Sequence, residues 1–356
     1  MKQAPSWIFL LPARKFATLR LCTGGAMNRI GRHTADLLFS AACAFFLSAN
    51  LARAADAPDC KPLQLLNSIK MTTNADRSRF YVPVTINGAP KNFLLDTGGG
   101  LTQITQSAVN ELKLEGTFTR IIMRDLYGHA SDRAVRVKTF DLGRQRGENM
   151  RIQVSAIPTL SDDAAGLLST DLFLQYDIDL DFGADRLNYF SQDHCEGRIA
   201  YWAERPLAVL PVDLSGGHLN VDVTLDGKVF HAILDTGAPV TTTGTNAVAN
   251  TFNLQPGSPE LPVIKEDKDH PAIKFYAHNF DRLSFGDIAV LHPQIELMPQ
   301  LTMWGGGDPM LRNIIIGINV LRQLHIYIAY KEKKLYITPA GNGESALFKA
   351  TVSSPP

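Results

Sequence analysis

The amino-acid sequence predicts an all-β fold built from two tandem lobes. Segments with the alternating pattern of strands are bounded by Gly, Pro and Asn, and few stretches have helical periodicity. One ordered set of segments also occurs twice along the chain, which indicates an internal duplication. A length of 356 residues is more than one ordinary domain needs, which favours two lobes.

The first repeated element is a strand, a tight turn and a buried strand that ends in Asp-Thr-Gly. In the first copy, an Asn-Gly turn at 87–88 precedes Asp-Thr-Gly at 96–98. In the second copy, an Asp-Gly turn at 226–227 precedes Asp-Thr-Gly at 235–237. Turn and motif are each displaced by the same 139 positions. Asn-Gly and Asp-Gly between apolar strands are typical of hairpin turns.

The second repeated element is a small-residue turn, one helical turn and a strand. Its copies cover 166–182 and 314–330. A further strand follows each copy, at 187–189 and at 335–337, and we predict that the resulting hairpin closes each lobe. The predicted organisation is a leader over 1–54, lobe one over 55–195, a linker over 196–206, lobe two over 207–340 and a tail over 341–356.

The leader has the three parts of a secretory signal. Positive charges after Met27 precede a short apolar run at 37–49, and the segment ends at Ala52-Arg53-Ala54. We expect Met27 to be the true start and cleavage to follow Ala54, which predicts a periplasmic or secreted protein. The run is too short for a comfortable membrane span. The alternative is an uncleaved anchor.

Cleavage after Ala54 would leave Cys60 and Cys195 of the four cysteines. Because an exported protein meets an oxidising compartment, this pair suggests a disulfide between the start and the end of the first lobe. The alternative is two unpaired thiols.

Composition and spacing argue against several other functions. Lys plus Arg and Asp plus Glu both number 35, so the chain is not built to coat nucleic acid or an anionic membrane. The nine histidines lack metal-ligand spacing, and no cofactor or metal is expected. Asp177, Asp179 and Asp181 alternate with apolar residues, which predicts a strand rather than a calcium loop.

The two Asp-Thr-Gly turns carry the candidate chemistry. Two carboxylates held in contact cannot both ionise, so Asp96 and Asp235 would share a proton. One could then deprotonate water while the other protonates or polarises a peptide carbonyl. Threonine can hydrogen-bond across to the opposite loop, and glycine lets backbone approach the carboxylate.

Leu-Leu-Asp-Thr-Gly at 94–98 and Ile-Leu-Asp-Thr-Gly-Ala at 233–238 resemble the retropepsin-like aspartic proteases, over roughly 63–339. The chain is similar to two such units fused, as in a bacterial family of aspartyl proteases. The resemblance implies β-barrel lobes with a cleft between them, an exported endopeptidase of bacterial source, and a monomer that forms the pair within one chain. Its substrate would be an extended peptide or protein segment. A catalytically weak or inactive peptide-binding relative is the alternative.

The resemblance also assigns residue roles. It implies Asp96 and Asp235 as catalytic and, as their supports, Thr97, Gly98, Thr236, Gly237 and Ala238. Gly99-Gly100 stands where the family often has Ala, Ser or Thr, which predicts a looser first loop. Ser169 stands where the second copy has Gly317.

Flaps are expected after each Asp-Thr-Gly. Tyr127 and Gly128, within 124–137, have the pattern of a hairpin tip that could cover substrate, and the counterpart is expected between Lys265 and Tyr276. An ordinary surface hairpin is the alternative.

Overall fold

The structure is a computed structural model. It describes residues 60–124, 129–160, 164–202, 207–267, 271, 273–299 and 313–341. The predicted leader, residues 203–206 of the linker, and the tail from residue 342 lie outside the described residues. So do the flap candidates Tyr127 and Gly128.

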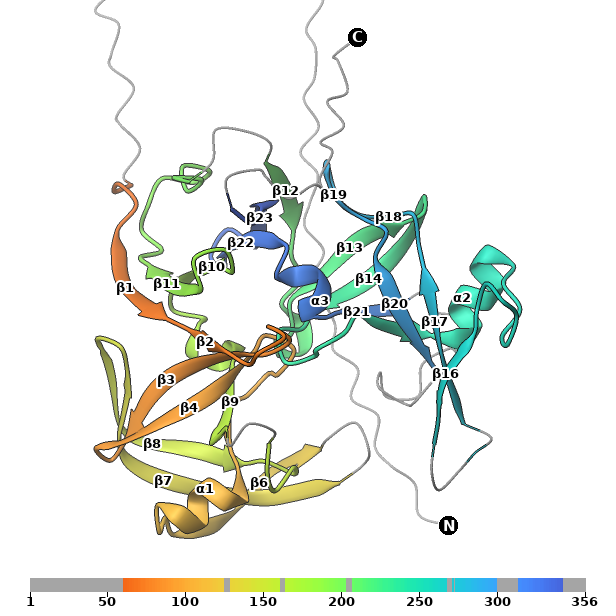
Figure 1. Cartoon of the computed structure of the whole chain (residues 1–356). Helices are drawn as coiled ribbons and strands as arrows, with labels where there is room; N and C mark the ends of the chain where they lie inside the picture. Colours follow the sequence, from red (N-terminus) through yellow and green to blue (C-terminus); the bar gives the residue numbers. More distant parts are fainter. Residues whose placement is uncertain are drawn as a thin grey trace, which may run out of the picture. The chain divides into compact units, whose positions relative to one another are not determined.

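The described part of the chain is nearly all β, which confirms the predicted fold class (Figure 1). Its α-helices are short: α1 (Gln106–Glu111), α2 (Thr245–Phe252) and α3 (Ile318–Leu321). Two 3-10 turns, η2 (Thr170–Leu172) and η3 (Ser215–Gly217), accompany them. Among the described residues, no helix combines the length and apolar character needed to cross a bilayer.

The first lobe is built on an eight-stranded sheet with the order β2-β3-β4-β9-β5-β8-β7-β6. Its strands are β2 (Thr72–Thr73), β3 (Phe80–Ile86), β4 (Ala89–Asp96), β5 (Gln103–Ile104), β6 (Gly116–Arg124), β7 (Ala130–Leu142), β8 (Gln145–Val154) and β9 (Gly166–Ser169). Strands β4 and β9 run parallel, and their register pairs Asp96 with Ser169.

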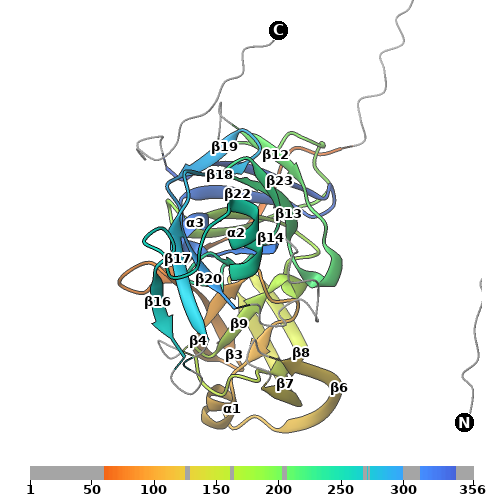
Figure 2. The ribbon, with the colours of Figure 1, turned by 90° about the vertical axis from the view of Figure 1, so that its right-hand side faces the viewer.

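The second lobe repeats this plan in a nine-stranded sheet, β16-β17-β20-β15-β21-β14-β13-β18-β19, with α2 packed on β15 and β20 (Figure 2). Its strands are β13 (Asn220–Leu225), β14 (Lys228–Leu234), β15 (Thr242–Gly244), β16 (Val263–Glu266), β17 (Lys274–Asn279), β18 (Arg282–Phe285), β19 (Ile288–Leu291), β20 (Gln294–Met298) and β21 (Asn313–Ile316). Strands β14 and β21 are parallel, as β4 and β9 are in the first lobe.

The hairpin turns occur where the sequence predicts them. Asn87 and Gly88 join β3 to β4, and Asp226 and Gly227 join β13 to β14. All four residues have positive φ, from 41° at Asp226 to 86° at Gly88. This conformation costs little at Gly and is tolerated at Asn and Asp, which explains the dipeptides at the two turns.

A third, six-stranded sheet contains strands from both halves of the duplication, in the order β1-β11-β10-β22-β23-β12. Its strands are β1 (Leu65–Lys70), β10 (Asp177–Asp181), β11 (Arg186–Phe190), β12 (Ala208–Pro211), β22 (Leu324–Ala329) and β23 (Lys334–Pro339). The prediction that each hairpin closes its own lobe is therefore wrong. The hairpins β10–β11 and β22–β23 instead pair edge to edge through β10 and β22.

The strand predicted through the alternating aspartates is present as β10, but both of its faces are buried. Asp177 and Asp179 are fully buried beside Ile178 and Leu180. His194 Nε2 lies 2.6 Å from Asp177 Oδ2. These aspartates are thus components of a buried polar network in the shared sheet, whose carboxylates are satisfied by hydrogen bonds.

The second aspartate of the network is equally well bonded. His325 Nε2 lies 2.5 Å from Asp179 Oδ1, and Tyr201 donates to Asp179 Oδ2 at 2.9 Å. Because His325 belongs to β22 and Tyr201 to the segment between the lobes, Asp179 of β10 binds parts of both halves and of the connection.

Cys60 and Cys195 form a disulfide, with their Cα atoms 4.8 Å apart. This confirms the predicted pairing. The bond joins the start of the described chain to the residues that follow β11, so it holds both ends of the first lobe together.

Candidate active site

The two Asp-Thr-Gly turns meet where the lobes join. Asp96 is the last residue of β4, and Asp235 directly follows β14. The three residues before each aspartate, 93–95 in β4 and 232–234 in β14, are apolar and buried. The carboxyl groups share a hydrogen bond. A side chain on Gly237 would begin 2.7 Å from Asp96 Oδ1 and 3.1 Å from Asp235 Oδ1, so this glycine leaves the space that the carboxyl groups occupy.

The threonines of the motifs hydrogen-bond across the junction in a reciprocal pattern. The amide of Thr97 donates to Thr236 Oγ1 at 3.0 Å, and the amide of Thr236 donates to Thr97 Oγ1 at 3.1 Å. The hydroxyls then donate to carbonyl oxygens of the opposite strand, Leu234 and Leu95, at 2.7 and 2.8 Å. Both threonines are about 1% exposed, so four bonds shielded from water fix one loop against the other.

Burial raises the pKa values of both carboxyls, and repulsion from Asp235 raises that of Asp96 further. Asp96 is 8% exposed, and its desolvation, followed by the charge of Asp235, raises its pKa well above the usual range. Burial also raises the pKa of Asp235, but the amides of Gly237 and Ala238 oppose this effect. They donate to Asp235 Oδ1 at 2.8 and 3.2 Å, which favours its ionised form. The amides of Gly98 and Gly99 oppose the rise at Asp96 as well, but there the charge of Asp235 adds to burial, so the pKa of Asp96 is raised more. Asp96 therefore holds the shared proton more strongly.

A second shared pattern supports both loops. In lobe one, Thr102 donates through its amide and hydroxyl to Asp171 Oδ1, at 2.9 and 2.7 Å. In lobe two, Thr241 donates in the same way to Asn319 Oδ1, at 2.8 Å for both. These four residues are missing from the sequence analysis. They could have been found there, because Thr102 and Thr241 differ by the same 139 positions as the motifs.

The loop after the first motif is closely packed, contrary to the looser loop expected from its glycines. A side chain on Gly99 would begin 2.6 Å from both Asp96 Oδ2 and Ser169 Oγ. One on Gly100 would begin 3.3 Å from the carbonyl oxygen of Gly216. Gly99 therefore leaves room for Asp96 and Ser169, and Gly100 lets η3 of the second lobe approach this loop.

His218 follows η3 and also contacts the first motif. Its Nδ1 lies 2.7 Å from the carbonyl oxygen of Gly98, so Nδ1 carries the hydrogen and donates it. A half-buried histidine of lobe two thus holds the Asp-Thr-Gly loop of lobe one. Histidine spacing in the sequence gave no sign of this role.

The second predicted flap segment forms a hairpin. Strands β16 and β17 pair antiparallel, with Lys265 opposite Phe275, inside the range predicted from Lys265 to Tyr276. In lobe one, β6 and β7 form the arms of a hairpin, and Arg124 pairs with Ala130. The role of either hairpin in covering substrate stays a prediction.

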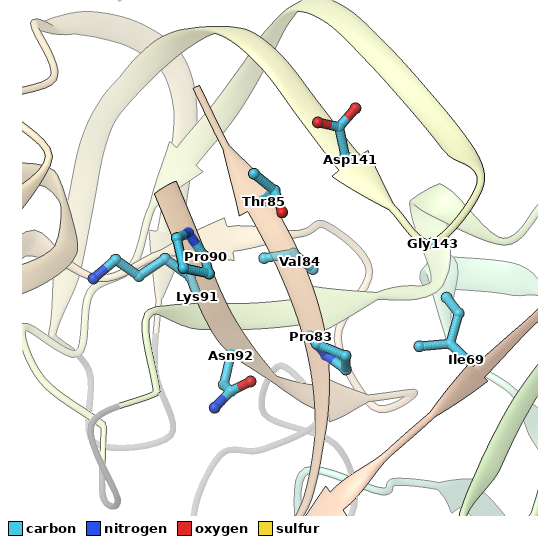
Figure 3. A pocket seen from close by; sticks show the side chains of 9 residues that line it. All are labelled: Ile69, Pro83, Val84, Thr85, Pro90, Lys91, Asn92, Asp141 and Gly143. Carbon is cyan, nitrogen blue, oxygen red and sulfur yellow. The ribbon is translucent and has the colours of Figure 1, made fainter. Parts of the chain in front are cut away.

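A pocket on the first lobe lies apart from this site. Its lining comes from β1, β3, β4, β7 and the turn after β7 (Figure 3): Ile69, Pro83, Val84, Thr85, Pro90, Lys91, Asn92, Asp141 and Gly143. Lys91 already pairs with Glu111, and Asp141 with Arg146, each at 2.5 Å. None of the motif residues lines it. Within the described residues, no three His, Cys, Asp or Glu side chains gather as metal ligands would.

Comparison with known families agrees with the geometry. Residues 82–172 match the family model described as aspartyl protease. The chain carries an aspartyl protease domain. The matched segment runs from within β3 to the end of η2, so this aspartyl protease domain includes Asp96 and Ser169 but not Asp235. A search of curated proteins found none that matches the chain.

Replacing Thr97 by Val is expected to lower the free energy of unfolding by about 3 kcal/mol. The change removes two hydrogen bonds and leaves the carbonyl of Leu234 and the amide of Thr236 unpaired, at roughly 1–3 kcal/mol for each buried group. Urea unfolding measures the loss. Thr85→Val, at a half-exposed position of the otherwise mostly buried β3, is the matched control and should change stability little. Equal stability of the two variants would contradict the role of the threonine bonds.

Proposed function

We propose that the chain is an exported aspartic endopeptidase in which Asp96 and Asp235 together activate one water. The observation that carries this proposal is the meeting of two Asp-Thr-Gly turns in one buried, hydrogen-bonded pair of carboxyls. The aspartyl protease domain supports a protease function. That domain contains Asp96 alone, and Asp235 of the second lobe supplies the second carboxyl of the pair.

The asymmetry of the pair supports a division of roles. Asp235, which accepts two backbone amides, is the base that deprotonates the water. Asp96 keeps the shared proton and gives it to the carbonyl oxygen of the scissile peptide bond. The hydroxide formed attacks the carbonyl carbon, and the tetrahedral intermediate breaks down when a proton reaches the leaving nitrogen. Substrate would bind as an extended strand, aligned by backbone hydrogen bonds.

Export is supported by two independent features. The signal-like leader predicts passage out of the cytoplasm, and the Cys60–Cys195 disulfide is a bond that persists in oxidising compartments. The proposed location is therefore the periplasm or the cell exterior. The proposed active form is a monomer, since the duplication provides both carboxyls in one chain.

The test is cleavage of a reduced, alkylated protein by the chain from Ala55 onward, from strongly acidic to neutral pH. Internal cuts identified by mass spectrometry would establish an endopeptidase. The rate should fall as pH rises through the pKa of Asp96. Because burial and Asp235 raise that pKa, activity should persist above the pH at which an ordinary aspartate is ionised.

A peptide in which a hydroxyl-bearing carbon replaces the scissile carbonyl mimics the tetrahedral intermediate. It should inhibit more strongly than the same peptide with an ordinary peptide bond at that position. If the folded protein cuts nothing at any pH yet binds the mimic, the chain is the inactive peptide-binding relative. If it neither cuts nor binds, the proposed function is wrong.

A further inference from the structure

Ser169 has a buried hydroxyl for which the described residues provide no hydrogen-bond partner. The residue is 0% exposed, and its Oγ is among the buried polar atoms left unpaired. Leaving such a group unpaired is costly, so its persistence calls for a physical reason.

The location of this hydroxyl supplies the reason. In the parallel pairing of β4 and β9, Ser169 is the direct partner of Asp96. The point where a Gly99 side chain would begin lies 2.6 Å from Ser169 Oγ and 2.6 Å from Asp96 Oδ2. The hydroxyl and this carboxyl oxygen therefore face the same small space, which glycine leaves open. Asp96 Oδ1, in contrast, faces Gly237 and Asp235.

Comparison with the second lobe shows that a hydroxyl beside the aspartate is specific to the first lobe. The amide of Ser169 donates to Thr102 Oγ1 at 3.1 Å, and the amide of Gly317 donates to Thr241 Oγ1 at the same distance. Ser169 and Gly317 are thus equivalent positions. A side chain on Gly317 would collide with the backbone of Val240, so the second lobe has no room for a hydroxyl here.

We propose that Ser169 is a positioning residue for Asp96: its hydroxyl donates to one water in the space over Gly99, and this water donates to Asp96 Oδ2. This inference rests on the proposed function, since it assigns the group that orients one carboxyl of the pair. Both carboxyls receive backbone amides, those of Gly98 and Gly99 at Asp96 and those of Gly237 and Ala238 at Asp235, and only Asp96 has a buried side-chain hydroxyl beside it in addition. The bond from the water holds the plane of the Asp96 carboxyl, so that Oδ1 and its proton point at Asp235 and at the substrate.

Three other titratable groups lie on the surrounding loops. Asp235 faces Asp96 directly, His218 donates to the Gly98 carbonyl, and Asp171 accepts the two bonds of Thr102. Ser169→Ala changes none of them, so a shift in the pH profile of that variant reports on Asp96.

The test compares Ser169→Ala with Ser258→Ala, because Ser258 also has a buried unpaired hydroxyl but is neither part of the motifs nor a strand partner of either aspartate. A lost hydrogen bond to a charged carboxylate raises its pKa, so the alkaline limb of the kcat/KM profile should move upward by about one pH unit in Ser169→Ala. We expect kcat to fall roughly tenfold with little change in KM. Ser258→Ala should behave as the parent.

A second readout needs no activity. If Ser169 stabilises ionised Asp96, Ser169→Ala should lose more stability at neutral pH than at strongly acidic pH, where Asp96 is protonated in both proteins. If Ser169→Ala loses the same stability at all pH values and its pH profile is unmoved, the proposal is overturned. Ser169 would then contribute only to packing. If the parent cuts no peptide, the proposed function fails, while the stability measurement still decides whether Ser169 acts on Asp96.

Discussion

Replacing either Asp96 or Asp235 by Asn is expected to lower kcat/KM for peptide cleavage by roughly 10³-fold or more. Asn cannot take a proton from water, and it cannot give one to the peptide carbonyl. Because the two carboxyls share one proton, neither can catalyse cleavage without the other. The double variant should therefore be about as inactive as either single variant, since residues that act as a unit do not add.

The matched control for this prediction is Asp222→Asn. Asp222 is an exposed carboxylate on β13 that pairs with His231 at 2.7 Å, and its loss should leave cleavage unchanged. Steady-state kinetics on a peptide identified from the protein digest would compare the parent with the two single variants, the double variant and Asp222→Asn. Residual cleavage in Asp235→Asn close to that of Asp222→Asn would show that the catalytic pair is wrongly assigned.

Stability provides an independent check that the inactive variants are folded. The pKa of Asp96 is raised in the folded protein, so the folded state binds its proton more tightly than the unfolded state does. Stability is therefore lost as pH rises from the unfolded to the folded pKa. Asp96→Asn removes this loss, and we expect it to unfold at a higher temperature than the parent at neutral pH but not under strongly acidic conditions.

The duplication explains how much of the site could be predicted from the sequence. Hairpin turns and Asp-Thr-Gly motifs are local signals, set by turn chemistry and by strand ends, and they recur at one separation. The reciprocal threonine bonds also follow from the repeat, because two equivalent loops that face each other exchange equivalent contacts. This is why Thr97 and Thr236 could be expected to bond across the junction.

The features that the sequence analysis missed depend on contacts between distant segments. The shared sheet forms because β10 and β22 have free edges, and no local pattern reveals which edge a strand will meet. The alternation along β10 correctly predicted a strand, but it did not reveal that the aspartates are buried against His194 and His325. The packing of Gly100 likewise depends on η3, which lies more than a hundred residues away in the chain.

Replacing Gly98 by Ala should reduce cleavage by roughly 10²-fold, although it removes no functional group. The new methyl carbon would lie 2.5 and 2.6 Å from the carboxyl oxygens of Asp235, far inside contact distance. The carboxyl must then move away from Asp96, and a displacement of about 1 Å can cost such a factor in rate. Gly237→Ala should have the same effect from the other side, because its methyl would begin 2.7 Å from Asp96 Oδ1.

Gly116→Ala is the control that separates this steric effect from the general cost of losing a glycine. Its methyl would meet only the guanidinium of Arg133, at 3.0 Å, and this flexible group can move aside. Gly116→Ala should therefore cut at the parental rate. In Gly98→Ala, separated carboxyls would repel each other less, so the alkaline limb of the pH profile should also move downward. A slow Gly98→Ala with an unshifted profile would mean that the methyl obstructs substrate rather than parting the two aspartates.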